Sequence, residues 1–446
     1  MFEENHESLD RFRRAFAGEA AEYEVQRMTV HLMGCRRCRL LAARAMGERK
    51  ARGPIAASEP LRYLLELFEA EEAGSEKWLE AQVTWAEIRP LSIKARRDKV
   101  RLTRSLHTLT FLRVLLEEGT AADTPAESEE IFYLALLVAG LLPSPEHSAE
   151  FKNDLCAECC AELANARRRQ AKWPAARDAL RKGVGYAERG SKDGVAEGRV
   201  LCVEGALEDD LGNTEEAARI LRRAIGLFEA EREAFLVSRT LVQLAYILVD
   251  LNPTESLEVV DKAFSLIPDN NPRLLWFAEI VRTNCLITLS SPREALLRFK
   301  DLKELHEQFR EPVMQLRGRF TAARLLEHLG RPQKAERLFQ EVIAGDLEHG
   351  LIKDFYLDLV YLLGFHLRRG QTSEAVAVCR RAIQELSLPD DEEGSGEYAR
   401  DQMRTVWSDL EAEIKKGTLD LGATAVLRSY IKAHWRTPAS DPPSFR

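Results

Sequence analysis

Hydrophobic and polar residues follow a helical period along most of the chain, and one arrangement returns several times. A short polar turn precedes a small residue, and apolar residues stand four and seven positions after it, as Leu221 and Ala224 do after Ala217. Residues with this spacing lie on one side of an α-helix. The small residues that start the copies are 41, 39, 39, 40 and 40 positions apart; they are Ala176, Ala217, Ser256, Ala295, Ala335 and Ala375. This constant step indicates an internal repeat of about 40 residues.

Each copy of the repeat predicts a hairpin of two helices. A second apolar stretch lies upstream of the small residue, for example LVQLAYILVDL at 241–251. Glycine favours the left-handed conformation that ends a helix, and proline fits the first turn of the helix that follows. Such residues mark the turns at Gly212-Asn213, Asn252-Pro253, Ser291-Pro292, Gly330-Arg331-Pro332 and Gly370.

The pattern divides the chain into four parts. Residues 145–390 carry the clear repeats, and residues 53–144 carry more divergent helical hairpins. Residues 391–446 predict a linker, capping helices at EYARDQMRTVWSDLEAEIKKG and ATAVLRSYIKAHWR, and a disordered tail. The first 52 residues form a part of their own. We therefore expect an all-α fold in which stacked hairpins form a solenoid.

Composition narrows the class of protein. The 446 residues carry a formal net charge of −8, which argues against a chain-wide binder of nucleic acid. No apolar run reaches the roughly 18 residues of a membrane-spanning helix, and no apolar signal-peptide segment is present. Eight cysteines are too few for a disulfide scaffold of this size. We expect a cytoplasmic protein with no membrane partner.

One N-terminal cluster has the composition of a metal site. His31, Cys35 and Cys38 have the spacing H-x3-C-x2-C, and His6 stands 25 residues upstream of His31. Two imidazoles and two thiolates make a complete tetrahedral set for zinc. Gly34 can end one helix, so both cysteines would begin the next, where the helix N-terminus favours thiolate. With four protein ligands, the zinc would be structural. The alternative is a pair of ordinary cysteines with two surface histidines.

The hairpins resemble the tetratricopeptide repeat. The matching features are the Gly-x-x-x-x-Ala turn from Gly330 to Ala335 and the large apolar Phe339 four residues later. The usual unit of that family is 34 residues, so the helices here would be longer. The resemblance implies a right-handed superhelix whose concave face binds a protein or peptide. It assigns the groove to Arg317, Phe320 and Arg324, which would hold an acidic peptide. A solvated helix face is the alternative.

The first 50 residues resemble the zinc-binding anti-sigma family. In that family an N-terminal His or Cys precedes H-x3-C-x2-C by about 25 residues, and His6, His31, Cys35 and Cys38 match position by position. The resemblance implies a domain that clamps an extracytoplasmic-function sigma factor and keeps it from RNA polymerase. Some members release the sigma factor on thiol oxidation. Membrane-bound members continue into a transmembrane helix, whereas here a helical array follows.

Two other clusters have structural explanations. Cys156, Cys159 and Cys160 lie in an amphipathic helix, where buried cysteines are expected. The basic segment IKARRDKVRLTR at 93–104 is expected to form a solvated face or ion pairs between helices, and nucleic-acid binding is the alternative. No nucleophile elbow, phosphate loop or other catalytic motif is present.

These patterns predict a non-enzymatic regulatory adaptor of a bacterial cytosol. Its zinc domain would dock a partner, with a sigma factor as the candidate, and its repeats would bind a second protein or peptide. One alternative is a plain repeat scaffold for complex assembly. Another is a DNA-binding regulator, which the charge balance disfavours.

Overall fold

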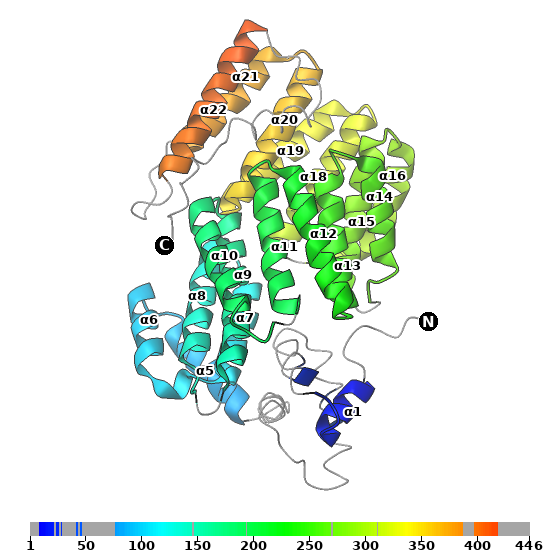
Figure 1. Cartoon of the computed structure of the whole chain (residues 1–446). Helices are drawn as coiled ribbons and strands as arrows, with labels where there is room; N and C mark the ends of the chain where they lie inside the picture. Colours follow the sequence, from blue (N-terminus) through cyan, green and yellow to red (C-terminus); the bar gives the residue numbers. More distant parts are fainter. Residues whose placement is uncertain are drawn as a thin grey trace, which may run out of the picture. The chain divides into compact units, whose positions relative to one another are not determined.

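The computed structural model describes most of the chain from residue 76 onward. It describes residues 9–21, a few positions at 24–25, 28, 42 and 45–46, then residues 76–386 and 397–417, apart from 145–146, 193, 269–270 and 310. All regular secondary structure in these ranges is helical (Figure 1). The prediction of an all-α fold is confirmed for this part of the chain. None of its helices has the length and apolar content needed to cross a bilayer.

The chain forms two compact units. The first comprises residues 1–166, 178–203 and 223–237, and the second comprises residues 167–177, 204–222 and 238–446. The helices up to the middle of the chain are α1 (Leu9–Ala17), α5 (Glu76–Ile88), α6 (Ile93–Leu102), α7 (Leu109–Ala121), α8 (Pro125–Leu141), α9 (Ala149–Arg169), α10 (Trp173–Ala187), α11 (Gly194–Asp210), α12 (Thr214–Ala230) and α13 (Ala234–Leu248). The helices that follow are α14 (Pro253–Phe264), α15 (Pro272–Thr288), α16 (Pro292–Asp301), α17 (Lys303–Glu307), α18 (Pro312–His328), α19 (Pro332–Glu348), α20 (Ile352–Arg368), α21 (Thr372–Leu386) and α22 (Glu397–Lys416).

The small residues that start each repeat are the points of closest helix packing. All six, from Ala176 to Ala375, are fully buried. The facing position on the preceding helix is equally restricted: a Cβ added at Gly205 would lie 2.9 Å from Leu221 Cδ2. Successive helices pack on one another, as α18 does on α19 and α19 on α20. The repeat seen in the sequence is therefore a repeat of the helix packing.

We expect Ala335→Leu to destabilise the second unit by about 1–3 kcal/mol, because the extra methylene groups have no room where α19 packs on α18. Urea unfolding followed by circular dichroism measures this. Lys334→Leu is the matched control, because Lys334 is the exposed neighbour of Ala335. Equal unfolding midpoints for the two variants would contradict the close packing at Ala335.

The predicted turns lie where the hairpins reverse. Pro253, Pro292 and Pro332 are the first residues of α14, α16 and α19. Gly330 and Gly370 follow α18 and α20 with φ angles of 72° and 67°, a conformation that a side chain disfavours. Hydrogen bonds also recur with the repeat: Arg324 bonds Asn284, 40 residues back, and Arg368 bonds Glu327, 41 residues back.

Two regions outside the clear repeats refine the predictions. The helices are interrupted between residues 102 and 109, because α6 ends at Leu102 and Thr108 caps α7 by accepting a hydrogen bond from Phe111 N at 3.2 Å. The first predicted C-terminal helix is α22, which packs on α21. The second lies outside the described residues, as does the linker at 391–396.

Candidate functional site

A small pocket lies among helices of the second unit, lined from α13, α15, α18, α19 and α20 and from Asp250 just after α13. Its volume is about 60 Å³. Its aromatic wall residues are Tyr246, Phe277, Phe320 and Tyr361. Its charged wall residues are Asp250, Asp346, Asp354, Asp358, Arg317 and Arg324. The three residues that the repeat resemblance assigned to a groove, Arg317, Phe320 and Arg324, thus line one pocket.

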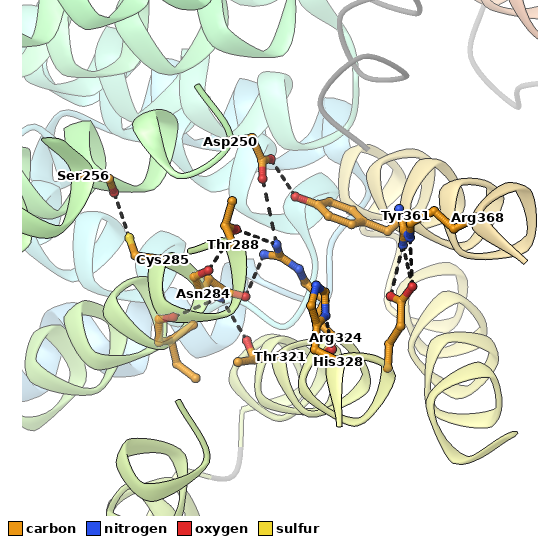
Figure 2. Close-up of polar contacts among 12 residues, drawn as sticks. Asp250, Ser256, Asn284, Cys285, Thr288, Thr321, Arg324, His328, Tyr361 and Arg368 are labelled. Carbon is orange, nitrogen blue, oxygen red and sulfur yellow. Dashed lines mark hydrogen bonds and ion pairs between the residues drawn. The ribbon is translucent and has the colours of Figure 1, made fainter. Parts of the chain in front are cut away.

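Arg324 is held inside the protein by a set of polar contacts (Figure 2). Its guanidinium donates to Asn284 Oδ1 at 2.8 Å and to Thr288 Oγ1 at 3.1 Å. It also lies 3.9 Å from Asp250 Oδ1 and over the ring of Tyr361 at 5.0 Å. The Tyr361 hydroxyl donates to the other Asp250 oxygen at 2.8 Å. Arg324 is therefore satisfied by its own chain and links α15, α18 and α20 with the end of α13.

Arg317, two helical turns before Arg324 on α18, has no such partners. Its guanidinium lies over the ring of Phe277 at 5.2 Å. No carboxylate of the described residues is within 4.0 Å of it, and it makes no hydrogen bond with them. Arg169 in the same unit also lacks an ion pair with described residues, and burial together with the charges of Arg317 and Arg168 lowers its pKa. Of the two arginines in the pocket wall, Arg317 is the one that makes no ion pair or hydrogen bond with the described residues.

Phe320 separates these two arginines along α18. Its ring meets the ring of Tyr361 edge-on at 4.8 Å and the ring of Phe339 at 5.8 Å. Edge-to-face contacts of this kind fix ring positions. Phe320 therefore forms a rigid part of the pocket wall.

The opposite charge in the pocket comes from a pair of buried carboxyl groups. Asp346 is 2% exposed and Asp358 is 6% exposed, and the two carboxyl groups are within hydrogen-bonding reach of each other. Burial, together with the charge of Asp354, raises the pKa of Asp346 to about 7, and burial raises that of Asp358 well above its usual range. At neutral pH the pair therefore holds a proton between its two carboxyl groups.

Asp354 behaves in the opposite way. Burial favours its neutral form, but the charges of Lys353 and Arg317 outweigh burial and lower its pKa to about 2. Lys353 Nζ lies 3.2 Å from Asp354 Oδ1 and 3.8 Å from Asp210 Oδ1. The wall therefore contains the ionised Asp354 beside the pair Asp346 and Asp358, which shares a proton.

We expect these groups to give the unfolding temperature a defined pH dependence. The raised pKa of Asp346 means that between about pH 4 and pH 7 the folded chain keeps a proton that the unfolded chain loses, so stability falls as pH rises through this range. The lowered pKa of Asp354 gives stability above about pH 4 that is lost as pH falls toward 2. Between pH 5 and pH 8, the unfolding temperature should depend less on pH in Asp346→Asn than in the wild type. The exposed control Asp301→Asn should keep the slope of the wild type. An unchanged slope in Asp346→Asn would contradict the assignment.

The sequence analysis did not single out these aspartates. Asp354 and Asp358 stand four residues apart, so they share one side of α20. Asp358 lies within the apolar stretch FYLDLVYLLGFHL, and Asp354 directly precedes it. Acidic residues inside an apolar stripe are the signal that marks them. Asp346, near the end of α19, has no comparable signal.

The predicted zinc ligands His6, His31, Cys35 and Cys38 lie outside the described residues. Of the same predicted domain, α1 ends where Gly18 takes a φ of 77°. Within the described residues no group of three or more His, Cys, Asp and Glu side chains is arranged to hold a metal ion.

The two remaining clusters have the structural roles expected of them. Cys156, Cys159 and Cys160 are buried. Burial raises the pKa of Cys156 to about 12 and that of Cys159 well above its usual value, so these two thiols stay protonated and unreactive. In the basic segment, Arg97 pairs with Glu130 at 2.6 Å and lies over the ring of Tyr133 at 4.2 Å. Arg97 therefore forms an ion pair between α6 and α8.

No protein-family model matches the sequence, and no curated protein matches it. The function is therefore inferred from the residues themselves.

Proposed function

We propose that the protein is a non-enzymatic regulatory adaptor with two binding parts. A zinc-stabilised domain at residues 1–52 docks a partner, for which an extracytoplasmic-function sigma factor is the candidate. The hairpins at 145–390 form a right-handed tetratricopeptide-like superhelix that binds a second protein or peptide. The adaptor works in the cytoplasm.

The proposed binding role of the array is supported by the difference between the two arginines in its pocket. Arg324 is satisfied by Asn284, Thr288 and Asp250. Arg317 lines the same pocket, makes no ion pair within 4.0 Å and no hydrogen bond with the described residues, and acts by its charge on Asp354. A guanidinium beside aromatic rings suits the acidic group of a bound protein or peptide.

The observation that supports the N-terminal role is the donor set. His6, His31, Cys35 and Cys38 supply two imidazoles and two thiolates, which suit structural zinc and leave no open coordination position for catalysis. Bound zinc would supply the cross-link that a domain of about 50 residues needs, because its hydrophobic core is small.

Co-purification tests the N-terminal part, with a substitution in the array as the control. The full chain, tagged at its C-terminus, is co-expressed with each extracytoplasmic-function sigma factor of the host bacterium. We expect one sigma factor to co-purify with the wild type and with Arg317→Glu, and to be lost from Cys35→Ser. If no sigma factor co-purifies, the protein is a plain scaffold and the anti-sigma role is wrong.

A further inference from the structure

Polar contacts join α20 to the first helices of much earlier hairpins in the second unit. Lys353 Nζ lies 3.8 Å from Asp210 Oδ1, at the end of α11. The Tyr361 hydroxyl donates to Asp250, just after α13, at 2.8 Å (Figure 2). These partners stand roughly three to four repeat lengths apart in the chain, whereas the hairpins of an open solenoid contact only their neighbours. The second unit therefore closes on itself across the first helices of its hairpins.

The closing contacts are made by charged side chains. Arg168, near the end of α9, pairs with the same Asp210 at 2.6 Å, and Arg324 lies 3.9 Å from Asp250. The side chains of Arg168 and Lys353 are each 13% exposed, and that of Asp210 is 10% exposed. In the closed array, these three cations are therefore held by carboxylates of the chain itself and are shielded from the carboxylates of a partner.

The closing contacts cover the face on which the proposed function places the ligand. Arg317 and Arg324 line a pocket there, and Tyr361 of α20 forms part of its wall. The pocket measures about 60 Å³, whereas an apolar cavity that holds benzene measures about 150 Å³. A peptide segment is too large for this space. Binding of a protein or peptide to this face therefore requires α20 to separate from the ends of α11 and α13.

We propose that the array is autoinhibited, with Asp210 and Asp250 holding the cations of its inner face until the acidic segment of a partner displaces them. Arg168, Lys353 and Arg324 then exchange one carboxylate for another, so none of them is left as an unpaired charge. The displaced aspartates become hydrated as the array opens, and neighbouring hairpins keep their own contacts. This inference rests on the proposed function of the array as a binding part, and it assigns a regulation to that same face.

Fluorescence anisotropy of the full-length protein with a labelled decaglutamate peptide tests the proposal. Asp210→Asn keeps the size of the side chain but removes the charge that holds Arg168 and ties Lys353 of α20 to α11. We expect this variant to bind the peptide at least about tenfold more tightly than the wild type. Asp301→Asn is the matched control, because it makes the same change of net charge at an exposed aspartate. It should bind the peptide as the wild type does.

Two further variants separate release of a cation from a change in the fold. Asp210→Asn/Arg168→Gln removes the carboxylate together with its nearest cation, so it should lose most of the gain in affinity. Tyr361→Phe removes only the hydroxyl that ties α20 to Asp250, and it should bind the peptide about threefold more tightly than the wild type. Circular dichroism checks that each variant is folded, and Tyr361→Phe keeps the test usable if Asp210→Asn does not fold.

Three outcomes would overturn the proposal. Equal affinities of the wild type and folded Asp210→Asn, or a gain that Asp210→Asn/Arg168→Gln keeps in full, would show that Asp210 does not mask a cation from the ligand. Both of these results leave the array as a binding part. Absence of peptide binding by the wild type and by every variant up to about 1 mM would also contradict the acidic ligand proposed for the array. Failure of this inference and failure of the proposed function are therefore distinguishable.

Discussion

Arg324→Met is expected to lower the free energy of unfolding of the second unit by about 3–5 kcal/mol, the usual cost of removing one member of a buried charged pair. Methionine fills much of the space but donates no hydrogen bond. Asn284 Oδ1 and Thr288 Oγ1 would each lose a donor, and Asp250 would lose the guanidinium that lies 3.9 Å from its Oδ1. Urea unfolding of the purified chain measures the loss.

The matched control is Arg319→Met, which removes an exposed arginine from the same helix and should change stability by less than about 0.5 kcal/mol. The double variant Arg324→Met/Asp250→Leu removes both charges and should recover part of the loss, because no carboxylate is then left without its cation. A loss below about 1 kcal/mol in Arg324→Met would show that the contacts of Arg324 contribute little to the fold.

The helical hairpins could be predicted from the sequence because their determinants are local. The buried small residues, the apolar stripes four and seven positions later and the turn residues all act within one hairpin. Gly330 and Pro332, for example, end one helix and begin the next without any distant contact. The interruption between α6 and α7 has a weaker signal in the sequence, because the Thr108 cap lies within an otherwise apolar and basic stretch.

The pocket could be predicted only in part. The resemblance assigned Arg317, Phe320 and Arg324 to one groove, and the three line one pocket, but it treated the two arginines alike. The two arginines differ in the residues that they contact. Arg324 reaches Asn284 one repeat earlier, and Asp250 is fixed by Tyr361, 111 residues away in the chain. Contacts over such distances depend on how the hairpins stack, which the period alone does not specify.

The pKa shifts of the aspartates on α19 and α20 also could not be predicted from the sequence. Burial, which raises the pKa of Asp346 and Asp358, exists only once α18, α19 and α20 pack together. Within the sequence, Asp346, Asp354 and Asp358 are three acidic residues among many. The structure therefore adds to the pocket a charge pattern that the sequence alone does not show.

Cys38→Ser should remove zinc from the protein and unfold its first 52 residues while leaving the helical array intact. Structural zinc in small domains contributes about 10–16 kcal/mol of apparent binding free energy, more than the entire stability expected of a domain this size. Elemental analysis should give one zinc per wild-type chain and none in the variant. Cys202→Ser, which changes a partly buried cysteine outside the motif, should keep its zinc. Limited proteolysis should then cut the N-terminal part of Cys38→Ser alone, with the unfolding temperature of the array unchanged. Freshly reduced wild type without zinc would remove the main support for the anti-sigma role, because His6, His31, Cys35 and Cys38 would then be ordinary side chains.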